Sequence, residues 1–206
     1  MTISALATAG GTLVLAGATF ASVRSANRAA RVAERSLLLG LRPVLLPSRP
    51  EDPDEHVKFV DHSFVVKGGG ARVEVVDGRL YFAFTIRNVG AGIAVLHGWQ
   101  IRPRRPSASD DHGDPADFRP LQRDLYVAPG DTGYWQGALR DPDEASHAEV
   151  RSAVDAGRPL AVEVLYGDHE GGQRTISRYG LIPAEGGDWT CTVLRHWQLE
   201  GRDPRH

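Results

Sequence analysis

The sequence predicts a mainly β protein: an antiparallel β-sandwich with one surface helix, preceded by an N-terminal transmembrane helix that continues into an Arg-rich amphipathic helix. Three observations lead to this expectation. The first 23 residues carry no charged side chain, residues 24–41 place arginines at helical spacing, and after residue 55 apolar residues recur with a period of two. The 206 residues, 41% apolar and 24% charged, have the composition of a folded chain.

The net charge of −2 is unevenly distributed along the chain. Residues 1–42 contain five arginines and one glutamate, a net of +4, whereas residues 43–206 contain nineteen basic and twenty-five acidic residues, a net of −6. The chain lacks the excess of Lys and Arg that binding to a phosphate backbone requires, so nucleic acid is not an expected partner. Cys191 is the one cysteine in the sequence, which excludes an internal disulfide.

The charge-free segment 1–23 is long enough to span a membrane, since about twenty residues of helix cross the hydrocarbon layer. A cleaved signal peptide, which would carry positive charge before its apolar stretch, and a buried core helix are the alternatives. Because arginines follow the segment and none precedes it, we expect a single-pass protein of the cell membrane, with the N-terminus outside and the C-terminal domain cytoplasmic. Small residues at four-residue spacing, such as Ala7 with Gly11, could let two spans pair in a homodimer.

Four arginines of the segment 24–41 recur at i, i+4, i+7 and i+11, so that a helix places them on one stripe. They are Arg24, Arg28, Arg31 and Arg35. We expect this stripe to contact anionic lipid headgroups, worth about 1 kcal/mol per arginine, and to set the topology. A specific partner site, or a coiled seam along the small-residue face opposite, remains an alternative.

Prolines from Pro43 to Pro53 end the helix, and residues 42–55 are expected to form a Pro-rich linker or edge strand. Residues 56–200 form the predicted β domain, followed by a tail, 201–206. The strands expected there are 57–60, 63–66, 73–76, 80–86, 93–101, 124–127, 133–139, 160–166, 173–179 and 190–197.

Turn chemistry supports two hairpins and one helix in this domain. Asp77-Gly78 separates two alternating segments and predicts a type I′ turn, in which both positions need a positive φ. A second hairpin turns at residues 168–172. One helix is expected from Asp141, as its N-cap, to Gly157, because Pro142 at the first helical position and Glu144 complete a capping box.

The order of these elements resembles small bacterial membrane-anchored β-sandwich proteins of uncharacterised function. The resemblance rests on the short apolar segment, on the run Ala33-Glu34-Arg35-Ser36-Leu37, on Arg42-Pro43, and on the strand end Asn88-Val89-Gly90-Ala91-Gly92-Ile93-Ala94. It implies an immunoglobulin-like domain on a membrane stalk and supplies no catalytic residue. In structural terms, the glycines of the last motif permit left-handed or bulged backbone, and Asn88 can bond its own turn.

The sequence contains none of the common nucleotide-binding, serine-hydrolase or zinc motifs, and no cofactor is expected. Its one suggestive constellation lies in the long loop 103–117. The charged face expected there consists of Arg104, Arg105, Asp110, Asp111 and Asp114. Together with His112, the three aspartates are also candidate ligands for a divalent cation, whereas acidic residues on a loop more often face water or a partner.

We therefore expect a membrane-anchored cytoplasmic binding or scaffolding module without catalysis, which presents the loop 103–117 to a protein partner. The first alternative is a metal-dependent hydrolytic enzyme that uses the acidic loop 110–114. The second is an envelope-facing β-sandwich protein, which requires the opposite topology.

Overall fold

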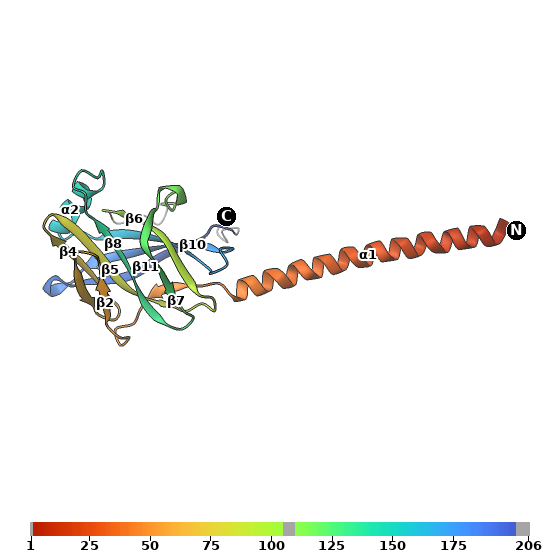
Figure 1. Ribbon diagram of the computed structural model, residues 1–206, viewed down its shortest axis with the longest axis horizontal. Helices are drawn as coiled ribbons and strands as arrows, with labels where there is room; N and C mark the ends of the chain where they lie inside the picture. The colour runs from red at the N-terminus through yellow and green to blue at the C-terminus, as the bar shows by residue number, and fades with distance from the viewer. Residues whose placement is uncertain (1, 105–109, 201–206) are drawn as a thin grey trace. The chain divides into compact units, whose positions relative to one another are not determined.

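The computed structural model describes residues 2–104 and 110–200, and they form a mainly β structure (Figure 1). The strands are β1 (Leu45–Pro47), β2 (Glu55–Lys58), β3 (Ser63–Val66), β4 (Gly70–Val76), β5 (Arg79–Asn88), β6 (Ala94–Arg102), β7 (Arg119–Val127), β8 (Thr132–Leu139), β9 (Leu160–Gly167), β10 (Arg174–Pro183) and β11 (Trp189–Gln198). The helices are α1 (Thr2–Gly40) and α2 (His147–Asp155), with the 3-10 turns η1 (Pro115–Asp117) and η2 (Glu185–Gly187).

The N-terminal unit, Met1–Gly40, is separate from the unit Leu41–His206, and its described part is the single continuous helix α1. The helix therefore runs through both the apolar segment and the arginine-bearing segment, and it ends before Pro43 as predicted. Arg24, Arg28 and Arg31 are exposed, whereas the side chain of Arg35 lies outside the described residues. Among the helices that the structure describes, none combines the length and the apolarity needed to cross a membrane.

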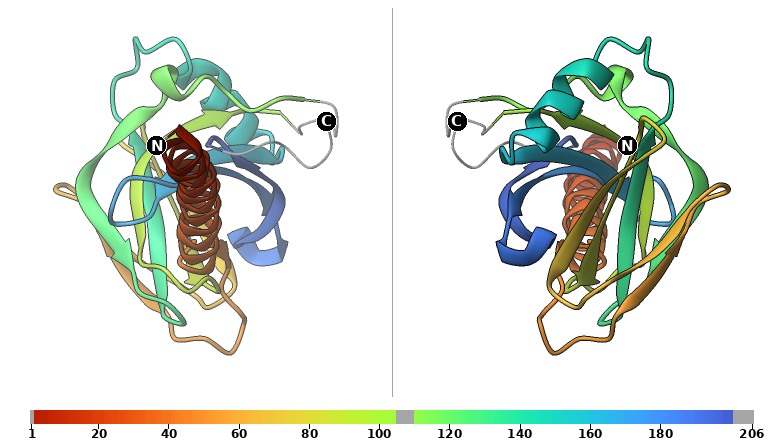
Figure 2. Two further views of the ribbon diagram at one scale, coloured as in Figure 1. Left: turned by 90° about the vertical axis from the view of Figure 1, so that its right-hand side faces the viewer. Right: turned by 90° about the vertical axis from the view of Figure 1, so that its left-hand side faces the viewer.

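The β domain is built around one antiparallel sheet, which confirms the mainly β prediction. Its strand order is β1-β5-β4-β11-β10-β9-β6-β7, with β8 on the other side of β5, and β2 and β3 form a separate hairpin. The two views of Figure 2 show the sheet curling around its own core. A sandwich has two separate sheets, whereas the two halves here belong to one sheet. The halves are joined where β4 pairs with β11, through Ala71 with Trp189 and Gly70 with Thr190.

The hairpin of β4 and β5 forms as the sequence predicts. Asp77 has φ 49° and Gly78 has φ 79°, and the strands pair from Val76–Arg79 onward. Alternation then directs Leu80, Phe82, Phe84 and Ile86 into the main core, which they share with residues of β9 and β10 from the opposite half of the sheet. The other face of β5 is buried by the β2–β3 hairpin, whose Val57 packs against Ala83.

Asn88 ends β5 at a corner and bonds its own turn, as expected, but the two glycines of the motif are needed for a different reason than we expected. Its side-chain oxygen accepts from the amides of Val44 (3.2 Å) and Gly90 (3.0 Å), and its amide nitrogen donates to the carbonyls of Gly92 (2.7 Å) and Val127 (3.0 Å). Neither glycine has a positive φ. Glycine is needed at both positions because a Cβ would overlap the backbone of residues 41–44, which crosses the corner at close range.

The expected helix begins five residues later than predicted, at His147 rather than at Pro142. The Asp141 carboxylate instead accepts from the Asp143 amide in a local turn, and Glu144 forms an ion pair with Arg119. The C-terminal end agrees with the prediction, since Gly157 has φ 60°. The helix α2 packs on β9 and contributes Val150 and Ala153 to the main core.

Candidate functional site

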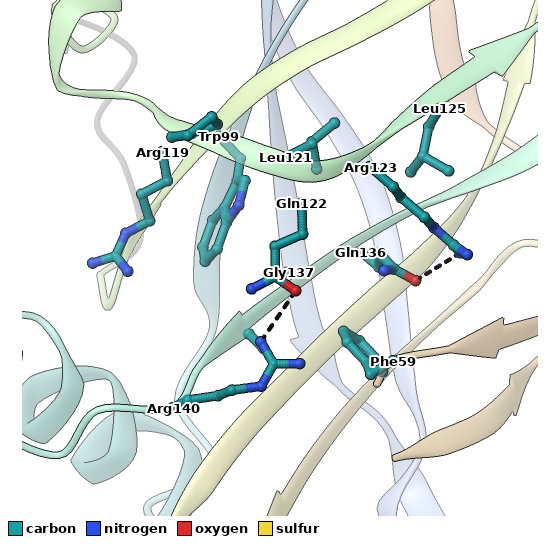
Figure 3. Close-up of a pocket in the computed structure, with 12 residues that line it drawn as sticks. Phe59, Trp99, Arg119, Leu121, Gln122, Arg123, Leu125, Gln136, Gly137 and Arg140 are labelled. Carbon is teal, nitrogen blue, oxygen red and sulfur yellow. Dashed lines mark hydrogen bonds between the residues drawn. The ribbon is translucent and has the colours of Figure 1, made fainter. Parts of the chain in front are cut away.

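A cleft separates β7 from β8, the two strands that lie at the edges of the curled sheet. Each has one hydrogen-bonded neighbour among the described residues: β8 pairs with β5, and β7 pairs with β6. The β7 ladder is interrupted by a large bulge, because four residues between Pro120 and Leu125 stand opposite His97 alone. The edges therefore do not close on one another, and a cavity of about 150 Å³ remains between them (Figure 3).

Three arginines line this cleft, which we call the arginine cleft. The described residues around it are Phe59, Trp99, Arg119, Pro120, Leu121, Gln122, Arg123, Leu125, Gln136, Gly137, Ala138 and Arg140. Arg119 and Arg123 come from β7, whereas Arg140 directly follows β8 (Figure 3). None of the described lining residues is a carboxylate, so the arginine cleft is a basic site on a β domain whose sequence is acidic.

Two of the arginines are held in place by carboxylates that lie outside the lining. Arg140 binds Asp61 with two nitrogens, Nε at 3.1 Å and Nη2 at 3.0 Å, and Asp61 also pairs with Arg79 at 3.3 Å. Arg119 pairs with Glu144 and donates to the Ser146 hydroxyl. Hydrogen bonds from Arg140 and from Tyr81 hold the pKa of Asp61 far below its usual range, while burial lowers the pKa of Arg119.

The third arginine, Arg123, has neutral partners. It donates to the Tyr134 hydroxyl and to Gln136 Oε1 at 3.1 Å, and its guanidinium lies 5.6 Å from the centre of the Tyr134 ring. This contact crosses the cleft from β7 to β8, as does the bond of 3.4 Å from Arg140 to Gln122 Oε1 (Figure 3). Both bridges use the carbonyl oxygens of the glutamines, and both join a cation to a neutral acceptor.

The wall of the cleft on the core side is apolar. Trp99 is 4% exposed, and its ring lies beneath the Arg119 guanidinium at 5.4 Å and against Trp135 at 5.3 Å. Gly137 lets β8 pack closely against the indole rings of Trp99 and Trp135, because a Cβ there would approach the two rings at 2.8–3.0 Å. The cleft thus places three guanidiniums beside an apolar wall on its core side.

The acidic loop that the sequence singled out lies elsewhere, on the outer face of β9 and β10. There Glu163, fully buried, accepts from Arg178 Nε (2.7 Å) and Nη2 (2.5 Å), from Gln100, and from the Gly113 amide (2.9 Å). Arg178 also donates to the carbonyls of Asp110 (3.2 Å) and Asp111 (2.6 Å). A buried ion pair therefore holds this part of the loop by its backbone.

The side chains of the predicted loop site have separate surroundings. Asp110 lies 3.7 Å from Arg104, Asp114 caps η1 through the Ala116 amide, and the His112 ring contacts Trp197 edge-on at 5.6 Å. Asp111 is exposed. Arg105 lies outside the described residues. Over residues 2–104 and 110–200, no group of three or more His, Cys, Asp or Glu residues is arranged to hold a metal ion.

The glycine triplet 68–70, at the start of β4, binds its own chain. The Gly68 amide donates to Asp54 and the Gly69 amide to the Ser48 hydroxyl. Partial burial lowers the pKa of both His97 and His196. His196 is hydrogen-bonded to Ser177 at 2.5 Å.

Sequence reasoning did not find the arginine cleft. Arg119, Arg123 and Arg140 are spread over twenty-two positions without a recognisable spacing, and β7 was expected to start only at Asp124. The alternation of Arg119, Leu121, Arg123 and Leu125 is the one local signal that the segment offers.

The geometry defines a mainly β protein with an arginine-lined cleft between its edge strands. Neither the models of known protein families nor the curated protein sequences match the chain. Among solved structures, the crystal structure of a protein assigned as ApaA from Bordetella pertussis aligns with 78% of this chain and 100% of that one, at 15% identity and a TM-score of 0.21. A similarity at this level carries no argument about fold or function.

Proposed function

We propose that the protein is a non-catalytic binding module, attached to a membrane through α1, whose β domain takes its ligand in the arginine cleft. The observation that carries the proposal is the set of three guanidiniums between two strand edges that do not close. Clefts with a few fixed polar groups over an apolar wall are the usual form of a small-ligand site.

The chemistry of the lining supports binding rather than catalysis. The described lining residues offer guanidinium, amide, aromatic and aliphatic groups. Arginine stays protonated at any physiological pH and cannot accept a proton, and glutamine is neither a nucleophile nor a base. Such a set of groups orients an anion and compensates its charge.

Membrane attachment is supported by the sequence of α1. Residues 1–23 of the chain are uncharged, and the exposed arginines that follow would place the β domain on the cytoplasmic side. We also propose that the chain is related to the immunoglobulin-like membrane-anchored proteins that it resembles. Alkaline carbonate extraction of cell membranes tests the mode of attachment. A spanning helix stays in the membrane pellet, a helix bound to headgroups is released, and a chain found only in the supernatant before extraction refutes the proposal.

Occupancy of the arginine cleft is tested by a photo-crosslinking amino acid placed at Gln122, which is exposed and lines the cleft. The matched control is Glu170, exposed on the turn between β9 and β10. We expect irradiation of intact cells to give a covalent adduct from position 122 and none from position 170. Equal labelling at both positions, or none at 122, would contradict the proposed site.

The loop 103–117 supplies a second candidate surface, for a protein partner. The observation in its favour is that the Glu163–Arg178 pair holds the loop backbone while the Asp111 and Asp114 side chains remain exposed. Deleting residues 106–114 would remove bonds to this buried pair, so the surface is better tested by Asp111→Asn with Asp114→Ala. Retention of the partner by that variant would exclude this surface.

A further inference from the structure

Charge and geometry together restrict what the arginine cleft can bind. Two of its three arginines are ion-paired, Arg140 with Asp61 and Arg119 with Glu144, and Asp61 is shared with a fourth arginine, Arg79, which lies outside the lining. Together, these four arginines and two carboxylates carry an excess of two positive charges. A dianion would balance this excess, whereas a neutral or cationic ligand would leave it uncompensated.

The hydrogen-bonding groups of the cleft point to an acceptor with several oxygens. Arg123 has only the Tyr134 hydroxyl and the Gln136 carbonyl oxygen as hydrogen-bond partners among the described residues, and the bridge from Arg140 to Gln122 is long at 3.4 Å. Both bridges join a guanidinium to a neutral carbonyl oxygen, and an anionic oxygen would add a charge–charge attraction that the glutamine lacks, so an anion would displace both bridges. The freed glutamine amides could then donate to the same ligand.

The size of the cleft limits the bound group. A cavity of about 150 Å³ is smaller than the roughly 300–1,000 Å³ of sites that enclose a drug-sized ligand. It has room for one compact tetrahedral anion and a few waters, each of which occupies about 30 Å³. The rest of a larger ligand would extend past Phe59 and Gln122 to the outside.

We infer that the arginine cleft binds the phosphoryl group of a phosphate monoester, with Arg123 and Arg140 as its cationic ligands and Arg119 beside them over Trp99. Three terminal oxygens and a charge near −2 match guanidinium groups that approach from both sides of the cleft, which a carboxylate with two oxygens and one charge matches less well. The inference rests on the proposed function, since it names the ligand class of that site.

Calorimetric titration of the full-length protein tests this assignment, with inorganic phosphate and glycerol 3-phosphate as soluble probes. The test variant is Arg123→Gln, which removes the cation whose partners are neutral and so leaves the ion pairs intact. The control is Arg151→Gln, which removes an exposed arginine of α2. We expect Arg123→Gln to weaken binding at least about tenfold and Arg151→Gln to leave it unchanged, both with an unaltered melting temperature.

Vesicles distinguish a soluble ligand from a lipid. Phosphatidylcholine vesicles that contain phosphatidic acid present a phosphate monoester, and those that contain phosphatidylglycerol present a phosphodiester. Binding to the first, weakened by Arg123→Gln, together with no binding of the soluble probes, identifies a lipid headgroup. The inference would be overturned if the protein bound phosphatidic acid and phosphatidylglycerol vesicles equally, if Arg123→Gln did not change this binding, and if the soluble probes did not bind. Vesicle binding would then be assigned to other cations, such as those of α1.

Failure of the inference is separable from failure of the proposed function. If crosslinking at position 122 succeeds in cells while neither the soluble phosphates nor phosphatidic acid binds, the cleft is a binding site for another class of ligand. If crosslinking fails as well, both proposals are wrong.

Discussion

Replacing Arg178 by methionine should destabilise the β domain more than any surface substitution. The change keeps most of the side-chain volume but removes the closer cation of the buried Glu163 carboxylate and leaves it with Arg102, whose Nη2 lies 3.8 Å away. Four hydrogen bonds disappear, two to Glu163 Oε1 and one to each of the carbonyls of Asp110 and Asp111. Breaking a buried ion pair from one side typically costs about 3–5 kcal/mol, and we expect the free energy of unfolding to fall by that amount.

Urea denaturation followed by tryptophan fluorescence measures the loss, with Arg151→Met on the surface of α2 as the control, for which we expect less than about 0.5 kcal/mol. The double variant Arg178→Met with Glu163→Leu removes both charges and should recover much of the stability. Limited proteolysis provides a second measurement, because the loop 103–117 loses two of its backbone anchors. A loss below 1 kcal/mol, or a loop as resistant as in the wild type, would refute the reasoning.

Three further predictions concern single residues. Asn88→Ala should lower the free energy of unfolding by about 2–4 kcal/mol, measured in urea, because four hydrogen bonds of the buried Asn88 side chain are lost at the corner of β5; a loss within error of zero would contradict this. Gly113→Ala should destabilise by about 1–3 kcal/mol, since its Cβ would overlap the Gln100 side chain that bonds Glu163; an unchanged urea midpoint would argue against that packing. Asp61→Asn should reveal a pH dependence. Because the pKa of Asp61 is lowered in the folded protein, its contribution is present above the unfolded pKa near 4 and is lost as pH falls toward the folded pKa. The difference in melting temperature between wild type and variant should therefore shrink below about pH 4, and a constant difference would exclude the Arg140–Asp61 interaction as its source.

Local sequence rules were sufficient where one segment determines its own conformation. The Asp77-Gly78 turn, the alternation along β5 and the end of α1 before Pro43 depend on backbone sterics and on which face is apolar, and all three are found in the structure. The same rules predicted the wrong start for α2, because Glu144 forms an ion pair with Arg119, a residue twenty-five positions away, and does not complete the capping box.

The tertiary structure alone decided how distant surfaces meet. Glu163 alternates with the core residues of β9 and so lies on the outer face of this strand, yet Arg178 and the loop backbone cover it completely. The motif Asn88-Val89-Gly90 predicts a structural corner in which the glycine permits left-handed or bulged backbone, whereas the structure requires glycine because the backbone of residues 42–44 passes close to it. Contacts of this kind depend on chain segments that the local pattern does not connect.

The arginine cleft is the clearest case of this division. The sequence determined that β7 and β8 are consecutive strands, but a hairpin of two such strands would ordinarily pair and leave no space. The curl of the sheet and the bulge in β7 hold the two edges apart, and they bring Arg140 opposite Arg123 across the cavity. The residues of each segment determined that it forms a β-strand. Which strands pair depends on the whole sheet, so the cleft followed from how the sheet closes.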